Sequence, residues 1–395
     1  MYVKHYEEFI TSHGATLTFH PQEADILLVD TCATNQLKED ESLGLIKQHE
    51  AIAKEGSKVI VCGCLAGINP KRLQEHFKGE FFSPKNEKQL AQILCLDEED
   101  AKLLTAFDPR GRFMGGDYTG ASKKFRFLVR LCTLFHKIDH FFSLNWVPVF
   151  GKFLSCTQAA NPYAYAISIS QGCLGNCSFC VIPMAKGRTV SLPLALITDK
   201  IRIMVEKGVK KIILTSEDTG AYGSDIGISI IDLLKQIHKI PGDFELYIHY
   251  FDPRWLRLYG HELKVLLAQR RIQYLQLALQ SGDNEILKRM KRAYLIDQVL
   301  PFIEDFRKSF PRLAMSTQII TGFPGETQAQ FENSKSLLKK RLFDNVDVFA
   351  FSNRPGADTN TIPGHLEDKI IQERRRVLQR QWQWAKLFHL FSASA

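Results

Sequence analysis

The segment AYAISISQGCLGNCSFC, residues 164–180, joins a strand-like run to three closely spaced cysteines, and it decides the fold of the larger part of the chain. Its first seven residues are mostly apolar and typical of a buried strand. Five more such runs follow at intervals of about 30–45 residues, at residues 211–218, 244–251, 274–281, 315–323 and 345–352. Helical segments such as 196–208 and 328–341 lie between them. The alternation predicts a partial parallel (β/α)6 barrel over residues 161–365, with chemistry at the carboxyl ends of the strands, where the cysteines lie.

Residues 1–100 predict a second, smaller α/β domain with an open parallel sheet. The runs ADILLVDTC (24–32) and KVIVCGC (58–64) are typical of buried parallel strands. The helical pattern of residues 40–56 lies between them and ends at Gly56, a residue suited to a helix C-cap. Residues 101–160 then form a basic, aromatic segment between the domains, and residues 366–395 predict a C-terminal helix.

Composition narrows the class of protein and its location. The 395 residues carry a formal net charge of +8, which is compatible with a phosphate-bearing partner without requiring one. No apolar stretch is long enough for a transmembrane helix, and the Met1 end lacks the layout of a secretory signal. Nine cysteines without an export signal indicate reduced thiols in the cytoplasm, where grouped cysteines hold metals or do redox chemistry.

Two basic, aromatic-rich helical patterns leave alternatives open. Residues 122–158 place apolar side chains at helical spacing beside a basic side. This pattern fits a helix that binds a membrane surface or a partner, or an amphipathic helix packed across the domain junction, and the second interpretation is favoured. Residues 373–391 include the run Arg374–Arg376, which fits a phosphate contact or a solvated face.

The three cysteines of the loop, Cys173, Cys177 and Cys180, favour an iron–sulfur cluster over a structural zinc ion. Structural zinc takes four closed ligands, and this loop offers three at a tight spacing. Thiolates at such spacings hold iron–sulfur clusters. With three cysteines on a [4Fe–4S] cluster, the fourth iron is left open for a substrate or cofactor.

This loop resembles that of the radical S-adenosylmethionine (SAM) enzymes, and the wider chain resembles their methylthiotransferase family. The resemblance covers nearly everything except residues 100–160 and the last few residues. It rests on motifs at or just beyond the strand ends: KGRTVS (186–191), LTSEDTGAYGSDIG (214–227), LQSGDNEILKRMKRAY (279–294), IITGFPGET (319–327) and SNRPGADT (352–359). The second of these is most similar to the branch that acts on N6-threonylcarbamoyladenosine in tRNA.

The resemblance implies an activity and its cofactors. It implies a [4Fe–4S] cluster on the three loop cysteines, with exchangeable SAM on the open iron as the source of a deoxyadenosyl radical. It implies a second [4Fe–4S] cluster in the first domain, with Cys32 and Cys64 at two of its three ligand positions. The expected reaction places a methylthio group on an unactivated C–H carbon of tRNA, with a reductant such as flavodoxin or ferredoxin supplying electrons.

Several residues at strand ends are candidates for SAM binding, and each has a structural alternative. In the alternative interpretation, Asp218 caps the following turn, Arg188 forms an interdomain ion pair, and the glycines only allow a turn of the backbone. The candidates are Glu217 and Asp218 for the ammonium, Gln280 and Ser281 for the ribose, Arg188 for a carboxylate or phosphate, and Gly322 and Gly325 for close approach to the adenine.

The chain departs from the family pattern in three places. The family's first amino-terminal cysteine and its strand would fall upstream of Met1, so Cys62 is a candidate third ligand, although a buried apolar role is favoured. Residues after 365 show no RNA-binding β-barrel. Gln276, Ala278 and Gln318 stand where the family usually has His, Pro and Asp.

These departures keep two other functions open. One is a radical SAM enzyme of the same family that modifies a peptide, a protein side chain or a small metabolite. The other is a degenerate, non-catalytic relative, against which the intact loop cysteines argue.

Overall fold

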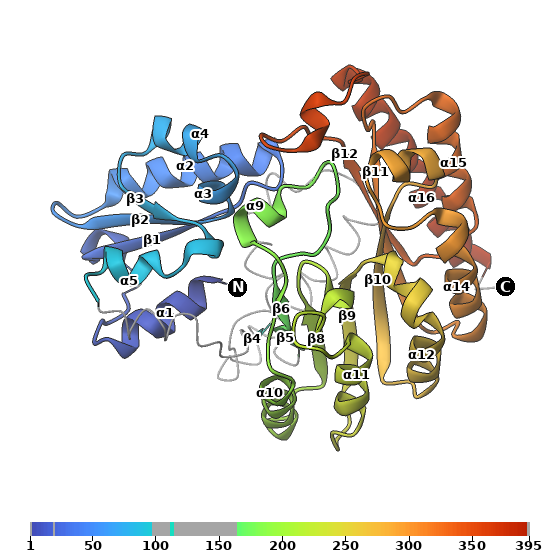
Figure 1. The fold of residues 1–395 in the computed structure, drawn as a ribbon, viewed down its shortest axis with the longest axis horizontal. Coiled ribbons are helices and arrows are strands. Elements are labelled where there is room, and N and C mark those ends of the chain that lie inside the picture. Colours follow the sequence, from blue (N-terminus) through green and yellow to red (C-terminus); the bar gives the residue numbers. More distant parts are fainter. Residues whose placement is uncertain (1, 19, 97–110, 114–163, 393–395) are drawn as a thin grey trace.

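The structure, a computed structural model, describes residues 2–18, 20–96, 111–113 and 164–392 and contains two α/β units (Figure 1). The basic segment 122–158 lies outside the described residues. No helix in the described part of the chain is long and apolar enough to cross a membrane.

The first unit is a small parallel sheet with the order β1-β2-β3. The predicted strands are confirmed as β1 (Ile26–Thr31) and β2 (Lys58–Gly63), and β3 (Glu80–Phe82) joins them. The predicted helix is confirmed as α2 (Gln36–Ile52), which starts where the Asn35 side chain accepts a hydrogen bond from the Lys38 N–H. Its predicted end at Gly56 is wrong, because the backbone is already extended at Ala53, and Gly56 has a φ of 79° in the turn before β2.

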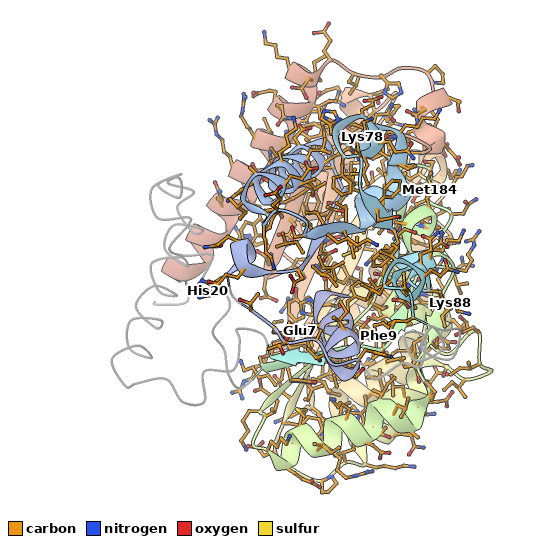
Figure 2. All side chains as sticks on the ribbon, turned by 90° about the vertical axis from the view of Figure 1, so that its left-hand side faces the viewer. Glu7, Phe9, His20, Lys78, Lys88 and Met184 are labelled. Carbon is orange, nitrogen blue, oxygen red and sulfur yellow. The ribbon has the colours of Figure 1, made fainter. Side chains whose placement is uncertain are left out.

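Helices cover both faces of this sheet (Figure 1). One core, with Val29, Leu43 and Val61, packs under α2, α3 and α4; the other contains Tyr6, Ile60 and Phe82. Phe9 of α1, labelled in Figure 2, belongs to the second core. The remaining elements of the unit are α1 (Tyr2–Ser12), η1 (Pro21–Glu23), α3 (Cys64–Ile68), α4 (Pro70–His76), η2 (Pro84–Asn86) and α5 (Gln89–Ile93).

The second unit is a seven-stranded open sheet with the order β12-β11-β10-β9-β8-β5-β4. All six predicted strands are present and pair with one another in parallel, so the partial barrel is confirmed. The short strand β4 was not expected: it comes from the interdomain segment and pairs antiparallel with β5. The strands are β4 (Gly111–Phe113), β5 (Ala164–Ser168), β8 (Lys211–Thr215), β9 (Glu245–Phe251), β10 (Ile272–Gln280), β11 (Ala314–Thr321) and β12 (Asn345–Ala350).

Six helices pack on the outer face of this sheet, where the alternate residues of the strands form one large core. Leu246 and Ile248 of β9 are fully buried in it. Burial of such a side chain contributes roughly 1.5–3 kcal/mol. The helices are α10 (Leu194–Glu206), α11 (Ile230–His238), α12 (Leu256–Ala268), α14 (Ile296–Ser309), α15 (Gln328–Lys339) and α16 (Asp368–Ser392).

Shorter elements lie at the carboxyl edge of the sheet. A two-stranded ribbon, β6 (Ser170–Gln171) with β7 (Val190–Ser191), closes the base of the cysteine loop. The others are α9 (Ile182–Lys186), η3 (Thr219–Ala221), η4 (Pro253–Trp255), α13 (Asn284–Arg289) and η5 (Asp358–Thr361).

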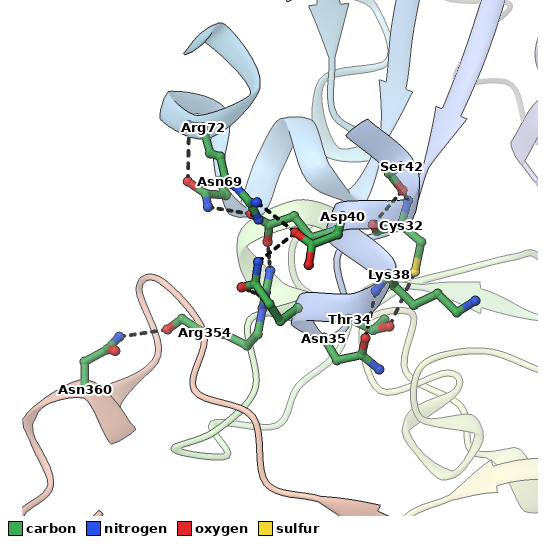
Figure 3. A network of polar contacts seen from close by, with 12 residues as sticks. Cys32, Thr34, Asn35, Lys38, Asp40, Ser42, Asn69, Arg72, Arg354 and Asn360 are labelled. Atoms are coloured by element: carbon green, nitrogen blue, oxygen red, sulfur yellow. Dashed lines mark hydrogen bonds and ion pairs between the residues drawn. The ribbon is translucent and has the colours of Figure 1, made fainter. Parts of the chain in front are cut away.

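The two units meet through α9 and the segment after β12. Ala185 and Ala357 of the second unit belong to the apolar core of the first. Gly67 of α3 lies so close to α9 that a Cβ on it would be 2.7 Å from the Cα of Ala185. Arg354 forms an ion pair with Glu39 of α2, and neither side chain is more than 2% exposed. Figure 3 shows Arg354 reaching toward α2, with Arg72 of α4 on the same carboxylate.

Candidate functional site

The loop with the three cysteines is fixed by contacts from distant parts of the chain. Gly172 has a φ of 81°, and a Cβ there would lie 2.3 Å from the carbonyl oxygen of Arg188, so glycine is required. The Ser178 N–H donates to the carbonyl oxygen of Met290 at 3.0 Å, and its hydroxyl donates to that of Arg289 at 2.8 Å. These contacts anchor the loop to the turn after α13.

The thiols of this loop lie close together at the carboxyl edge of the sheet. A Cβ on Gly175 would be 3.1 Å from the Sγ of Cys173 and 3.7 Å from that of Cys177, so glycine lets the loop backbone lie against both sulfurs. Burial raises the pKa of Cys173 to about 11 and that of Cys180 to about 12. A bound metal lowers the pKa of these thiols, because it binds the deprotonated thiolate.

The arrangement suits a cluster better than a single ion. Within the described residues, no three His, Cys, Asp or Glu side chains gather as they would around one metal ion. A four-iron cluster offers each thiolate its own iron, so its ligands do not have to converge on one point. Three soft sulfur donors on one short loop fit such a group.

Glu217 lies where β8 ends and is already engaged. One carboxylate oxygen accepts a hydrogen bond from the Gly172 N–H at 2.9 Å, and the other accepts from Lys186 of α9. Glu217 thus ties α9 and the second strand of the barrel to the base of the cysteine loop. Each oxygen of Glu217 has one hydrogen-bond partner here and keeps a further lone pair that can accept a SAM ammonium.

Asp218 is buried in a charged network and does not cap the turn that follows it. Its carboxylate accepts hydrogen bonds from the Arg254 guanidinium and from the Trp255 indole N–H at 3.0 Å. Burial and the neighbouring Asp252 outweigh Arg254 and raise the pKa of Asp218. The capping alternative is therefore wrong for Asp218, and the ammonium contact stays a prediction.

Gln280 is the candidate whose surroundings point most directly to a missing partner. It ends β10 with a φ of 67°, is 8% exposed, and its Oε1 has no hydrogen-bond partner. A buried acceptor without a partner costs about 1–3 kcal/mol, so a bound donor is expected there. Ser281 beside it is fully buried, and its hydroxyl accepts from the Asp283 N–H at 3.2 Å.

The other three candidates have structural partners. Arg188 donates to the carbonyl oxygens of Leu174 and Gly175 at 3.2 and 3.4 Å, so it braces the cysteine loop; its described hydrogen bonds do not include an interdomain ion pair. Gly322 and Gly325 adopt left-handed φ values of 77° and 73°. A Cβ on them would meet Ile371 and Arg289 respectively, which favours the turn interpretation.

In the first domain, Cys32 and Cys64 follow the adjacent strands β1 and β2 and lie near each other. Cys32 Sγ is 3.4 Å from the Thr34 hydroxyl, and the Ser42 hydroxyl fixes its backbone (Figure 3). Burial raises the pKa of Cys64 to about 11, and its charged neighbours are Lys186, Cys32, Asp30 and Glu217. Cys64 therefore lies near the Lys186–Glu217 ion pair of the barrel.

Cys62 lies in a different environment. It is fully buried in the core formed with Tyr6 and Phe82, and burial raises the pKa of its thiol strongly. Cys64 instead packs beside the core on the opposite face of the sheet. This placement supports the apolar role for Cys62.

Sequence reasoning missed the basic and acidic side chains under the cysteine loop. Arg292 donates to the Sγ of Cys177 at 3.2 Å and forms an ion pair with Asp252 at 2.8 Å. Two further ion pairs belong to this group: Arg254 with Asp218, and Lys186 with Glu217. The signal in the sequence was the run KRAY (291–294) after a predicted strand, but nothing local connects it to a cysteine 115 residues earlier.

Comparisons with known proteins agree with this geometry. Residues 167–338 match the Radical SAM superfamily, and residues 3–82 match a family described as Uncharacterized protein family UPF0004. A probable threonylcarbamoyladenosine tRNA methylthiotransferase of Pyrococcus abyssi is 30% identical over 371 residues, which cover 93% of this chain and 77% of the relative. The chain belongs to the radical SAM methylthiotransferase family.

Other members of the radical SAM methylthiotransferase family match over similar lengths. A probable threonylcarbamoyladenosine tRNA methylthiotransferase of Methanocaldococcus jannaschii is 29% identical, covering 94% of this chain and 77% of the relative. The ribosomal protein uS12 methylthiotransferase RimO of Carboxydothermus hydrogenoformans is 28% identical, covering 92% and 75%. Membership identifies this chain as an enzyme of the radical SAM methylthiotransferase type, with a [4Fe–4S] cluster and SAM as cofactors.

Solved structures support the fold alone. The radical S-adenosylmethionine methyltransferase TsrM of Kitasatospora setae, with tryptophan and a SAM analogue bound, has a TM-score of 0.55 at 14% identity. The match covers 91% of this radical SAM methylthiotransferase-family chain, which spans 66% of the length of TsrM.

Proposed function

We propose that this enzyme places a methylthio group on N6-threonylcarbamoyladenosine of tRNA. The observation that carries the proposal is that both cysteine groups lie near one ion pair, Lys186–Glu217. Cys173, Cys177 and Cys180 lie at the carboxyl edge of the barrel, and Cys32 and Cys64 face that edge from the first domain. A radical source and a sulfur source have to be adjacent if one substrate carbon is to meet both.

Each part of the site has a role in this proposal. The three loop cysteines hold the cluster, and Gln280 supplies an acceptor for a hydroxyl or ammonium of SAM. When bound, these cofactors supply a radical that removes hydrogen from a C–H bond without acidity, which side-chain acids and bases cannot do. Cys32 and Cys64 hold part of a second cluster. An external reductant such as flavodoxin or ferredoxin supplies electrons, and the cytoplasm is the proposed location.

The tRNA substrate rests on the relatives from Pyrococcus abyssi and Methanocaldococcus jannaschii, whose names state that activity. A protein side chain is the second candidate, because a relative at 28% identity over 371 residues is named for ribosomal protein uS12. The same reaction at the site would modify either substrate. The two differ in which surface of the enzyme has to bind them.

Mass spectrometry separates these substrates. Nucleosides from tRNA and tryptic peptides from ribosomes are compared between cells with the intact gene and cells that carry Cys177→Ala. Loss of the methylthio nucleoside alone supports the tRNA proposal. Loss of a methylthio peptide with unchanged nucleosides replaces it with the second candidate. An iron count of about eight per chain after anaerobic reconstitution supports two clusters, and about four supports the loop cluster alone.

A further inference from the structure

Arg292 is placed on the cysteine loop by the end of a helix far along the chain. Helix α13 ends at Arg289, and Lys291 then adopts a left-handed φ of 54°. The Arg292 N–H bonds back to the carbonyl oxygen of Leu287 at 2.9 Å, as in a Schellman motif. This turn directs the Arg292 side chain inward, where it is 6% exposed.

The guanidinium of Arg292 uses both terminal nitrogens inside the protein. Nη1 donates to the Sγ of Cys177 at 3.2 Å. Nη2 donates to the carbonyl oxygen of Ala278 at 3.0 Å and pairs with Asp252 at 2.8 Å. Asp252 is itself held, because its other oxygen accepts from the Arg254 N–H at 3.0 Å. The guanidinium therefore has little freedom, and it remains charged at all ordinary pH values.

We infer that Arg292 is a positioning residue that sets the reduction potential of the cluster on the three-cysteine loop, through its hydrogen bond to Cys177 and its buried positive charge. The inference rests on the proposed assignment of that cluster to Cys173, Cys177 and Cys180. In the step concerned, one electron passes from an external low-potential donor, which is oxidised, to the cluster. No bond in the protein forms or breaks.

The physical reason is electrostatic. Hydrogen bonds to the ligand sulfurs, local charge and burial are the protein's means of tuning such potentials. Three thiolates make the site negative, and an added electron increases that charge. A fixed guanidinium in contact with one sulfur stabilises the reduced form and raises the potential, while Asp252 offsets part of this effect because its charge is opposite.

Because Arg292 and Asp252 carry opposite charges, removing the charge of one or of the other is expected to shift the reduction potential of the cluster in opposite directions. The midpoint potential is measured by a dithionite titration followed by electron paramagnetic resonance. The full chain is reconstituted in a Cys32→Ala/Cys64→Ala background, so that only the loop cluster contributes. Arg292→Met is expected to lower the potential, Arg292→Lys to lower it less, and Asp252→Asn to raise it. Arg289→Met is the matched control, because the Arg289 guanidinium donates to Pro324 and Gln330 instead of to a cysteine.

The outcomes separate this inference from the proposed function. A reconstituted protein without a reducible cluster overturns both. A normal cluster whose potential is the same in Arg292→Met and Arg289→Met, or shifts in one direction for both Arg292→Met and Asp252→Asn, overturns the role of Arg292 alone. If Arg292→Met does not fold because Asp252 is left unpaired, Arg292→Met/Asp252→Asn is compared with Asp252→Asn, and the double variant is expected to have the lower potential.

Discussion

Lys186 and Glu217 form an ion pair that lies near both groups of cysteines. Glu217 also accepts from the backbone N–H of Gly172, next to Cys173, and both members of the pair lie near Cys64. The pair joins α9, which contacts the first domain, to the end of β8 in the barrel. The charges of this pair therefore act on the surroundings of both groups of cysteines.

Gly175→Ala tests whether the cysteines beside Gly175, Cys173 and Cys177, hold a cluster. The new Cβ would lie 3.1 Å from the Sγ of Cys173, which is tighter than ordinary van der Waals contact, so the cluster is expected to be lost or to bind weakly. Iron and sulfide content after reconstitution measure this, and circular dichroism reports the fold. Gly44→Ala in α2 is the control, since no atom lies within 4 Å of its Cβ. Full iron content in Gly175→Ala would contradict the assignment.

Gln280→Leu tests the acceptor that has no partner. Its removal is expected to weaken SAM binding by about tenfold, because a hydrogen bond contributes about 0.5–1.5 kcal/mol. The stability of the SAM-free protein is expected to stay the same or rise, since the unpaired oxygen is gone. Calorimetry measures both quantities. Gln276→Leu serves for comparison, because the Oε1 of Gln276 already accepts from the Tyr250 N–H at 3.1 Å. Unchanged SAM affinity in Gln280→Leu would rule out the contact.

Arg354→Met tests the buried ion pair between the domains. It leaves Glu39 buried, with only Arg72 as a charged hydrogen-bond partner, and breaking a buried pair costs about 3–5 kcal/mol. Urea denaturation measures the loss. The exposed pair of Lys38 and Glu41 gives the control, because Glu41→Gln is expected to change stability by less than about 1 kcal/mol. Equal losses in the two variants would show that burial does not matter here.

The same carboxylate predicts a dependence of stability on pH. Burial alone would raise the pKa of Glu39, but hydrogen bonds from Arg72 and Arg354 outweigh it and lower the pKa from its usual value of 4.5. A lowered pKa in the folded state adds stability above about pH 4.5, and this stability disappears as the pH falls through the lowered value. Glu39→Gln is expected to be less stable at neutral pH and to lose less on acidification than Glu41→Gln. Parallel pH curves for the two variants would refute this.

The strands of the barrel were predictable because each is an apolar run of β-formers at a regular interval. Strand β4 was not, since its three residues, GRF, carry no periodic signal and are ordered by pairing with β5. The end of α2 was misplaced because Gly56 is a suitable cap that the chain uses in a turn instead.

The residues of the candidate site also divide into those that the sequence predicts and those that it does not. The cysteine loop was predictable because its ligands lie within eight residues of one another. The capping alternative for Asp218 is wrong because its carboxylate binds Arg254 and Trp255, 36 and 37 residues away, which no local pattern predicts. Arg292 carried no local sign of its contact with Cys177, because that contact exists only after the barrel has folded.

The anchoring of the cysteine loop also orders events during biosynthesis. Ser178 bonds to Arg289, Met290 and the N–H of Thr359, all of which leave the ribosome long after the cysteines do. Nascent thiols therefore emerge before the backbone that shapes them exists, so the loop adopts this anchored shape only once the residues through Thr359 have been synthesised.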